Sequence, residues 1–383
     1  MIDDAHLTHG LAGDHLEPDW PPLTMGEIAM VVAHASALGS LLSIDWRSPR
    51  PLSAAALITT TGGRVFVKRH HRSVRDEQTL GEEHRFASFL REKGVPVPRM
   101  LRDDTGSSVI AIGDWVYEMH DPAHGVDVYR DAFSWSPIGG VRHARATGAM
   151  LAKLHAAASG FHADQRGTHI LIARAEILAS PEPLMTIAAQ LHARPALARY
   201  LRERDWHAEI GRAISPWHAR VAGALAAQPP LWTHGDWHVS NLCWSGTDDD
   251  ADITDVLDLG LSARTFALFD LATAIERNAI AWLDIAQADI ARHDLALAII
   301  DGYRAFGALE EADLDVLADL LPIVHLDFAL SEVEYFEGVT RRRDHADVAY
   351  HTFLRGHAAW FATPHGQAFL EAIRGAAGRF VVQ

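Results

Sequence analysis

The sequence predicts an α+β protein with two lobes: a small lobe built on an antiparallel sheet and one helix, and a large lobe that is mostly helical. Short β-rich runs separated by turn residues occupy positions 41–119, which predicts the sheet. From residue 141 onward, apolar residues recur at helical spacing instead. The chain has 383 residues, of which 48% are hydrophobic and 22% charged, as is typical of a globular protein of that size. We expect an N-terminal arm and helix at 1–39, the small lobe at 40–120 and the large lobe at 121–383.

Capping and turn residues define the expected elements of the small lobe. Thr24 and Glu27 form a capping-box pattern, which predicts a helix over about 24–38. A glycine pair at 62–63 predicts the turn of a β-hairpin, and a second helix is expected over about 74–93. Strands are expected at 41–46, 54–60, 64–69, 107–112 and 114–119.

Helical periodicity dominates the rest of the chain. A helix that includes residues 148–155 begins the large lobe, and two or three short helices follow over 170–204. Short strands are expected just before His234, at 242–244 and at 253–257. The remaining helices are expected at 208–227, 269–283, 290–306, 311–338 and 348–376.

Charge and composition narrow the possible partners. The formal net charge is −16, and an acidic surface argues against nucleic acid, whose phosphates require basic patches. We expect no membrane span, because no apolar stretch is long enough to cross a bilayer. The single cysteine, Cys243, and a start without a secretory leader favour the reducing cytoplasm. Nothing in the sequence sets the oligomeric state.

Two neighbouring motifs carry the chemistry. His234 to Asn241 reads H-x-D-x-x-x-x-N, and a later strand ends in D-x-G at Asp258. In kinase-type sites one aspartate accepts the proton of the attacking hydroxyl, while the asparagine and a second aspartate hold the magnesium ions that bridge the nucleotide phosphates. The ordered set therefore predicts phosphoryl transfer, with Asp236 as the base and Asn241 and Asp258 as the metal ligands.

Two other metal sites, one for zinc and one for calcium, are alternatives to this interpretation. His234 and His238 are four residues apart, as in a zinc helix, but glycine follows the first histidine where H-E-x-x-H needs glutamate. Three aspartates at 248–250 suggest a calcium loop, but their spacing does not fit an EF-hand. We expect a solvated turn there and no zinc at the histidines.

At these motifs the sequence resembles the aminoglycoside phosphotransferase family, whose relatives include choline, homoserine, fructosamine and methylthioribose kinases. The resemblance covers about residues 41–338 and implies a bilobal protein-kinase-like fold. It also implies that Asp236 is the catalytic base, that Asn241 and Asp258 bind magnesium, and that His234 supports the loop. Asp270, in an Asp-Leu-Ala motif, would be a further structural support. Leu259 stands where the family often has phenylalanine or tryptophan, a mild departure because the metal contact belongs to the aspartate.

The small lobe should bind the nucleotide. In kinase folds a lysine on the third strand contacts the phosphates and pairs with a glutamate on the next helix, which here suggests Lys68. The family spacing of glutamate, ten residues and G-x-P-x-P selects Glu83 over Glu82. Backbone groups around Glu118 and Met119 would contact the adenine. No glycine-rich loop precedes Lys68, so the residues that clamp the triphosphate stay undefined.

We expect the acceptor to bind at the helical run near Asp327. Asp327 and Glu334 are seven residues apart and share a helix face beside an apolar stripe, so they are candidate ligands for a cationic acceptor, with a solvated acidic face as the alternative. The predicted function is ATP- (or GTP-) and Mg²⁺-dependent phosphorylation of a small hydroxylated, amine-bearing molecule such as an aminoglycoside, amino sugar, homoserine or choline. The rival is a catalytically silent binding protein with the same fold.

Overall fold

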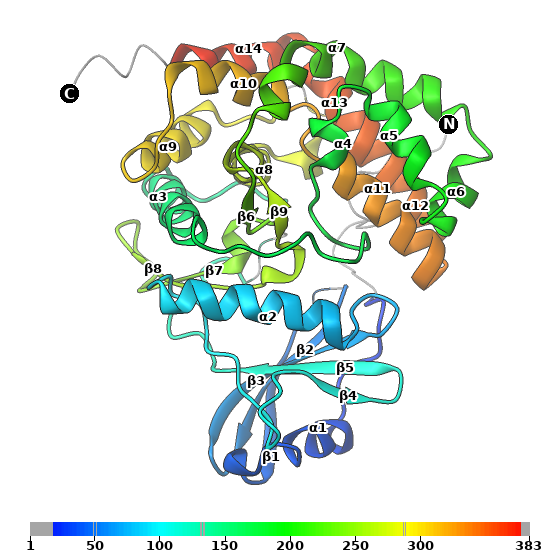
Figure 1. The fold of residues 1–383 in the computed structure, drawn as a ribbon. Helices are drawn as coiled ribbons and strands as arrows, with labels where there is room; N and C mark the ends of the chain where they lie inside the picture. The colour runs from blue at the N-terminus through cyan, green and yellow to red at the C-terminus, as the bar shows by residue number, and fades with distance from the viewer. Residues whose placement is uncertain are drawn as a thin grey trace.

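The computed structural model describes residues 18–376 except 49, 51, 131, 133–134, 286 and 288. A small sheet-based lobe and a larger helical lobe lie one above the other, as Figure 1 shows. This confirms the predicted α+β, bilobal, kinase-like architecture. Most of the predicted N-terminal arm lies outside the described residues.

The small lobe is a five-stranded antiparallel sheet in the order β1-β2-β3-β5-β4. Its strands are β1 Leu41–Arg47, β2 Ala54–Thr60, β3 Gly63–His71, β4 Ile110–Ile112 and β5 Trp115–His120. Helix α1, Met25–Val32, begins at the predicted capping box of Thr24 and Glu27. Its apolar residues share one hydrophobic cluster with β2, β3 and β5, so the predicted boundary at 39/40 separates α1 from the sheet on which it packs.

Helix α2, Glu77–Glu92, links the two lobes. Figure 1 shows it lying between the sheet and the large lobe. Its buried residues Phe86, Ala87 and Leu90 belong to the hydrophobic cluster of the large lobe rather than to that of the sheet. The helix that follows the Lys68 strand is therefore anchored on the lobe that carries the catalytic loop.

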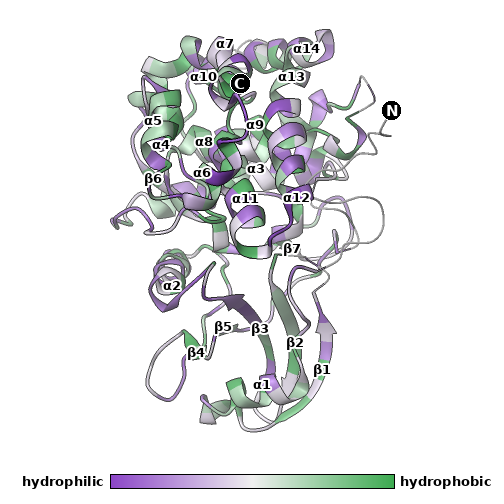
Figure 2. Ribbon diagram, turned by 90° about the vertical axis from the view of Figure 1, so that its right-hand side faces the viewer, coloured by the Kyte–Doolittle hydropathy of each residue, from purple (hydrophilic) through white to green (hydrophobic). Residues whose placement is uncertain are grey.

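The large lobe is mainly helical. The α-helices of its described residues are α3 Val141–Ala158, α4 Glu176–Ala179, α5 Pro183–Gln190, α6 Pro195–Leu201, α7 Trp206–Ala226, α8 Ala267–Ala279, α9 His293–Arg304, α10 Glu311–Leu320, α11 Leu326–Tyr335, α12 Arg343–Val348, α13 His357–Phe361 and α14 Pro364–Arg374. Helices α3 and α9 pack closely because glycines meet there: a Cβ on Gly148 would lie 2.0 Å from the Ile299 carbonyl oxygen. Helix α8 is buried from Leu268 to Ala279, and Figures 1 and 2 show it enclosed by other helices.

Two small two-stranded sheets lie on either side of the loop at 234–241, which carries the predicted catalytic residue Asp236. One pairs β6, Leu231–Thr233, with β9, Ala263–Thr265, and the other pairs β7, Leu242–Trp244, with β8, Ile253–Val256. Strand β9 was not predicted, and the run predicted as one helix over 311–338 is broken between α10 and α11. Among the described residues, no helix combines the length and the apolar character needed to span a membrane.

Candidate active site

The catalytic loop leaves β6 through a turn that requires glycine. Gly235 has φ +80°, and a Cβ at this position would lie 2.6 Å from the Leu261 carbonyl oxygen and 2.7 Å from the Cβ of Ala173. Both the left-handed backbone and the lack of space exclude a side chain. The glycine of the His-Gly-Asp motif therefore lets the chain turn so that Asp236 follows directly.

Asp270 of α8 stabilises this turn through hydrogen bonds to its backbone. Its carboxylate accepts hydrogen bonds from the backbone N–H groups of His234 (2.9 Å) and Gly235 (2.8 Å), and it contacts His155 Nε2 at 3.1 Å. His234 Nε2 lies 2.9 Å from the carbonyl oxygen of Leu257, next to the metal-ligand candidate Asp258. Asp270 and His234 thus connect the loop to α8 and to the end of β8, the geometry expected of supporting residues.

Asp236 lies among groups that stabilise its negative charge. Arg277 Nη1 contacts Asp236 Oδ1 at 2.6 Å, and His238 Nε2 lies 3.4 Å from Oδ2. Asn241 Nδ2 donates to the Asp236 carbonyl (3.0 Å) and to Oδ2 (3.3 Å). Burial acts to raise the pKa of the Asp236 carboxyl, but Arg277 and His238 outweigh it and hold the pKa below its ordinary value. Burial lowers the pKa of His238 to about 4, so this ring is neutral at pH 7.

The sequence prediction did not include Arg277 or the contact from His238. Arg277 lies seven residues after Asp270, hence two turns along the same face of α8. That spacing is the signal that a search for partners of the catalytic loop would have used. His238 was considered only as a zinc ligand; its Nε2 faces Asp236, whereas His234 Nε2 faces a backbone carbonyl.

Asp258 lies at the end of β8 in a left-handed backbone conformation, with φ +53°. Lys68 Nζ donates to its Oδ1 at 2.8 Å, and the side chain of Asp258 remains 41% exposed. Burial alone would lower the pKa of Lys68, but Asp258, Glu118 and Glu83 together raise it above the ordinary value, so the ammonium stays charged. Lys68 and Asp258 therefore join the two lobes with an ion pair.

The predicted contact pair of Lys68 and Glu83 is wrong for this structure. Glu83 is buried, and its Oε2 lies 3.6 Å from Arg166 Nη2. Arg166 also lies near Glu82, with Nε 3.8 Å from Oε2, and donates to the carbonyl groups of Gly260 and Thr79. Glu83 therefore lies beside the buried guanidinium of Arg166, a residue that the sequence prediction did not include. Asp258 makes the direct contact with Lys68.

The adenine contacts at Glu118 and Met119 stay a prediction, and of the two residues Glu118 lines the larger cavity described below. Both residues lie inside β5, which pairs with β3. Glu118 is opposite Lys68, and Met119 is opposite Val67. The buried Glu118 carboxylate accepts from His84 Nε2 at 2.7 Å, and His84 and His70 outweigh burial to lower its pKa well below the ordinary value. The Met119 side chain packs in the small-lobe core, and its carbonyl accepts from Leu101 N–H.

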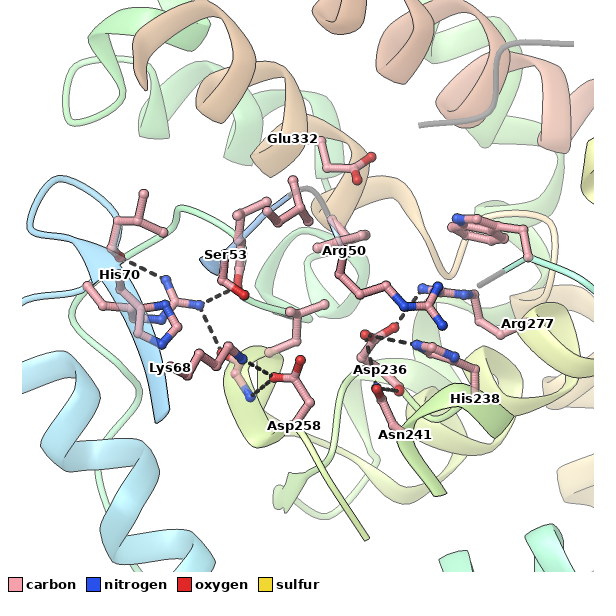
Figure 3. Close-up of a pocket in the computed structure, with 18 of the residues that line it drawn as sticks. Arg50, Ser53, Lys68, His70, Asp236, His238, Asn241, Asp258, Arg277 and Glu332 are labelled. Atoms are coloured by element: carbon pink, nitrogen blue, oxygen red, sulfur yellow. Dashed lines mark hydrogen bonds and ion pairs between the residues drawn. The ribbon is translucent and has the colours of Figure 1, made fainter. Parts of the chain in front are cut away.

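Two cavities meet at these side chains. A larger one of about 520 Å³ lies between the lobes, and its wall beyond Glu118 is formed by His120, Pro122 and Ala123. A smaller one of about 170 Å³ contains Asp236 and Arg277 in its wall. The residues that line both cavities are Arg50, Ser53, Lys68, Asn241 and Asp258. Figure 3 shows them around the smaller cavity, with Asp236 and Asp258 facing the same space.

Neither predicted acceptor residue on α11 lines these two cavities. Glu334 makes an ion pair with the buried Arg194, with Oε2 2.6 Å from Nε, and Asp327 Oδ1 lies 3.9 Å from Nη1 of the same arginine. Both carboxylates are buried, so the alternative of a solvated face is wrong as well. The face of α11 that reaches the smaller cavity instead presents Phe328, Glu332 and Phe336 at four-residue spacing.

Comparison with known proteins gives a consistent assignment. Residues 52–309 match the model of the phosphotransferase enzyme family. No curated protein sequence matches the chain.

Solved structures with the same fold include an amicoumacin kinase in complex with AMP-PNP and Ca²⁺, with a TM-score of 0.55, 14% identity, and coverage of 90% of this chain and 92% of that one. An aminoglycoside phosphotransferase from Alicyclobacillus acidocaldarius has a TM-score of 0.53 and 15% identity, with coverage of 94% and 98%. A microcompartment-associated aminopropanol kinase has a TM-score of 0.50 and 15% identity, again with coverage of 94% and 98%.

Proposed function

The chain belongs to the phosphotransferase enzyme family, and on that premise we propose that it transfers the γ-phosphoryl group of ATP to a hydroxyl group of a small, amine-bearing molecule. GTP is the alternative nucleotide. The observation that carries the proposal is the meeting of the two cavities: Lys68, Asn241 and Asp258 line both of them, and Asp236 lies in the wall of the smaller one. A group transferred between molecules in the two cavities passes these side chains.

The nucleotide fits the larger cavity. Its volume of about 520 Å³ lies within the usual range for a small-molecule site. Val97, Met100 and Leu257 supply apolar wall for the base, and the charged Lys68 lies at the end shared with the smaller cavity, where the phosphates belong. We infer that the adenine-facing backbone lies at 120–125, beyond Glu118 and Met119, because His120 ends β5 and Pro122, Ala123 and Gly125, which follow it, line the cavity as His120 does.

The donor set of the site fits magnesium. Asn241 uses its amide N–H groups on Asp236, which leaves the amide oxygen for another partner, and Asp258 has an exposed carboxylate. Carboxylate and amide oxygens beside phosphates form the usual magnesium environment. Mg²⁺ held there would neutralise charge on the β- and γ-phosphates during transfer.

Asp236 orients the acceptor hydroxyl and accepts its proton. Arg277 keeps the carboxylate ionised, which makes it a weak base. A weak base suffices because phosphoryl transfer passes through a loose transition state in which orientation and charge neutralisation dominate. The buried loop supports of Asp270 and His234 hold the carboxylate in that position.

The smaller cavity defines the acceptor. At about 170 Å³ it lies below the usual range for ligand pockets, so the acceptor, or the part of it that enters, is small. Glu332, between Phe328 and Phe336, is the carboxylate that α11 contributes to its wall. A carboxylate flanked by aromatic rings suits an ammonium group, through charge and cation–π contact. This transfers the predicted acidic acceptor contact from Asp327 and Glu334 to Glu332.

A screen of acceptor-dependent ATP consumption tests the proposal. The panel contains choline, homoserine, methylthioribose, amino sugars and aminoglycosides, with each product identified by mass. We expect an amine-bearing acceptor to be phosphorylated, and Glu332→Gln to raise its KM while Asp327→Asn, on the other face of α11, leaves KM unchanged. Binding of Mg²⁺–ATP without turnover of any acceptor would favour the silent binding protein, and turnover of neutral sugars alone would exclude the amine.

A further inference from the structure

The loop between β1 and β2 lies where other kinases cover the nucleotide phosphates with a glycine-rich loop. Residues 48–53 read Ser-Pro-Arg-Pro-Leu-Ser and contain no glycine. Proline has no backbone N–H, so this sequence offers few backbone donors to a phosphate. The charge that such a loop must neutralise therefore falls to its side chains, of which Arg50 is the cation.

Arg50 lies at the boundary between the two cavities. It lines both of them, together with Ser53 of the same loop. Figure 3 shows its side chain extending from the loop toward Asp236 and Arg277. Burial lowers the pKa of the Arg50 guanidinium below its ordinary value, whereas Asp127, Asp236 and Asp258 act to raise it. An arginine retains its charge under such conditions.

Two further cations near the boundary, Lys68 and Arg277, make ion pairs with carboxylates of the site. Lys68 Nζ contacts Asp258 at 2.8 Å. Arg277 Nη1 contacts Asp236 at 2.6 Å, and its guanidinium lies 3.8 Å from the centre of the Trp135 ring. Like Lys68 and unlike Arg277, Arg50 comes from the small lobe, opposite the lobe that carries Asp236.

We propose that Arg50 is a catalytic residue of this enzyme: it contacts the phosphoryl group during transfer and acts as an arginine finger supplied by the chain itself. The proposal rests on the proposed function. In the step, the bond between the acceptor oxygen and Pγ forms while the bond between Pγ and the bridging oxygen breaks. The acceptor proton passes to Asp236, and the electron pair of the broken bond stays on the β-phosphate of ADP. Arg50 stabilises the charge on the equatorial oxygens of the group in transit, where a planar fork of donors is most effective.

The test compares Arg50→Met, Arg50→Lys and Arg72→Met. Arg72 is the matched control, because it lies in the small lobe just after β3, pairs with Glu77 and is in the wall of neither cavity. Three quantities are measured for each: kcat, the Kd of a non-hydrolysable ATP analogue, and inhibition by ADP with aluminium fluoride, which imitates the group in transit. We expect Arg50→Met to lower kcat by about 10³-fold, the scale of an arginine finger. Inhibition by ADP with aluminium fluoride should weaken in parallel. The Kd of the ATP analogue should stay within about threefold of the parent value, which is less than a tenfold change in affinity.

Arg50→Lys should restore part of kcat, since charge returns without the fork, and Arg72→Met should keep both kcat and aluminium fluoride inhibition. Unchanged kcat in Arg50→Met overturns the proposal, whether the Kd of the analogue rises, which would make Arg50 a ground-state clamp, or the acceptor KM rises, which would make it an acceptor-binding residue. A parent protein that phosphorylates no acceptor would instead contradict the proposed function, so the two failures are distinguishable.

Discussion

Asp236 in the catalytic loop and Asp327 in α11 are both carboxylates near an arginine, yet they differ in charge. Arg277 contacts Asp236 at 2.6 Å and lowers the pKa of that carboxyl against the effect of burial. Asp327 lies 3.9 Å from Arg194, and burial raises its pKa to about 7. Arg194 makes its close contact with Glu334 instead. These two buried carboxylates thus differ in whether a cation is in contact with them or only near them.

The two regions therefore serve different purposes. An ionised carboxylate in the wall of a cavity can orient a hydroxyl and accept a proton, as the catalytic loop requires. Arg194 and Glu334 join α6 and α11 through a buried ion pair, and Asp327 is buried beside them. They fix the orientation of α11, whose opposite face presents Glu332 to the smaller cavity. The following changes test this difference, beginning with the largest expected effect.

Asp236→Asn removes the charge from the first region. The amide cannot accept the proton of the acceptor hydroxyl, so we expect kcat to fall by roughly 10³-fold, within the range for general-base catalysis. Nucleotide binding should persist, because Lys68 and Asp258 are untouched. Steady-state kinetics and calorimetric titration with an ATP analogue measure the two quantities, and near-normal turnover would exclude Asp236 as the base.

Arg277→Gln makes Asp236 resemble Asp327, because it replaces the contacting cation with a neutral group. The pKa of Asp236 should then rise, and since the ionised form is the active one, the acidic limb of the kcat profile should move to higher pH. If the pKa of Asp236 reaches about 7, the value of Asp327, kcat at pH 6 should fall about 10-fold, because a pKa one unit above the assay pH leaves about a tenth of the carboxyls ionised. Arg277→Lys, which keeps a cation, should shift the limb less. Identical pH profiles in all three proteins would show that Arg277 does not set the charge of Asp236.

Asp327→Asn tests the second region through stability. The pKa of Asp327 is raised in the folded protein, so its ionisation costs stability as pH rises from about 4 to about 7. Asparagine carries no such cost. The unfolding free energy of the variant minus that of the parent should therefore increase by about 2–3 kcal/mol from pH 5 to pH 8. Denaturant unfolding at both pH values measures this gain, and a difference independent of pH would contradict it.

Glu83→Gln should have the smallest effect. Glu83 lies beside Arg166, and Lys68 makes its direct contact with Asp258. We expect the KM for ATP to rise by no more than about fivefold, the scale of a weak ion pair. Lys68→Ala in the same assay should raise it further, because the ammonium itself is lost. A larger effect for Glu83→Gln than for Lys68→Ala would restore Glu83 as the partner that positions the lysine.

Asp236, Asn241 and Asp258, which line the smaller cavity, belong to the two short motifs of the sequence. Asp236, Asn241 and Asp258 follow strand ends, where local spacing alone determines their neighbourhood. Arg277 was missed because its contact with Asp236 joins residues 41 positions apart, through the packing of α8 under the loop. The acceptor prediction failed because periodicity identifies which residues share a helix face, whereas the direction of that face depends on tertiary packing. The buried Arg194, which neutralises Glu334, carried no signal of its own.

We expect Asp236 to be ionised at the pH where phosphoryl transfer takes place, and Asp327 to be the buried carboxylate that takes up a proton. Carboxyl ¹³C NMR of aspartate-labelled protein measures both charges directly, with resonances assigned by their loss in Asp236→Asn and Asp327→Asn. The resonance of Asp236 should stay at its ionised position from pH 8 down to pH 5, and that of Asp327 should titrate with a midpoint of about 7. An Asp236 resonance that titrates within this range would contradict the account.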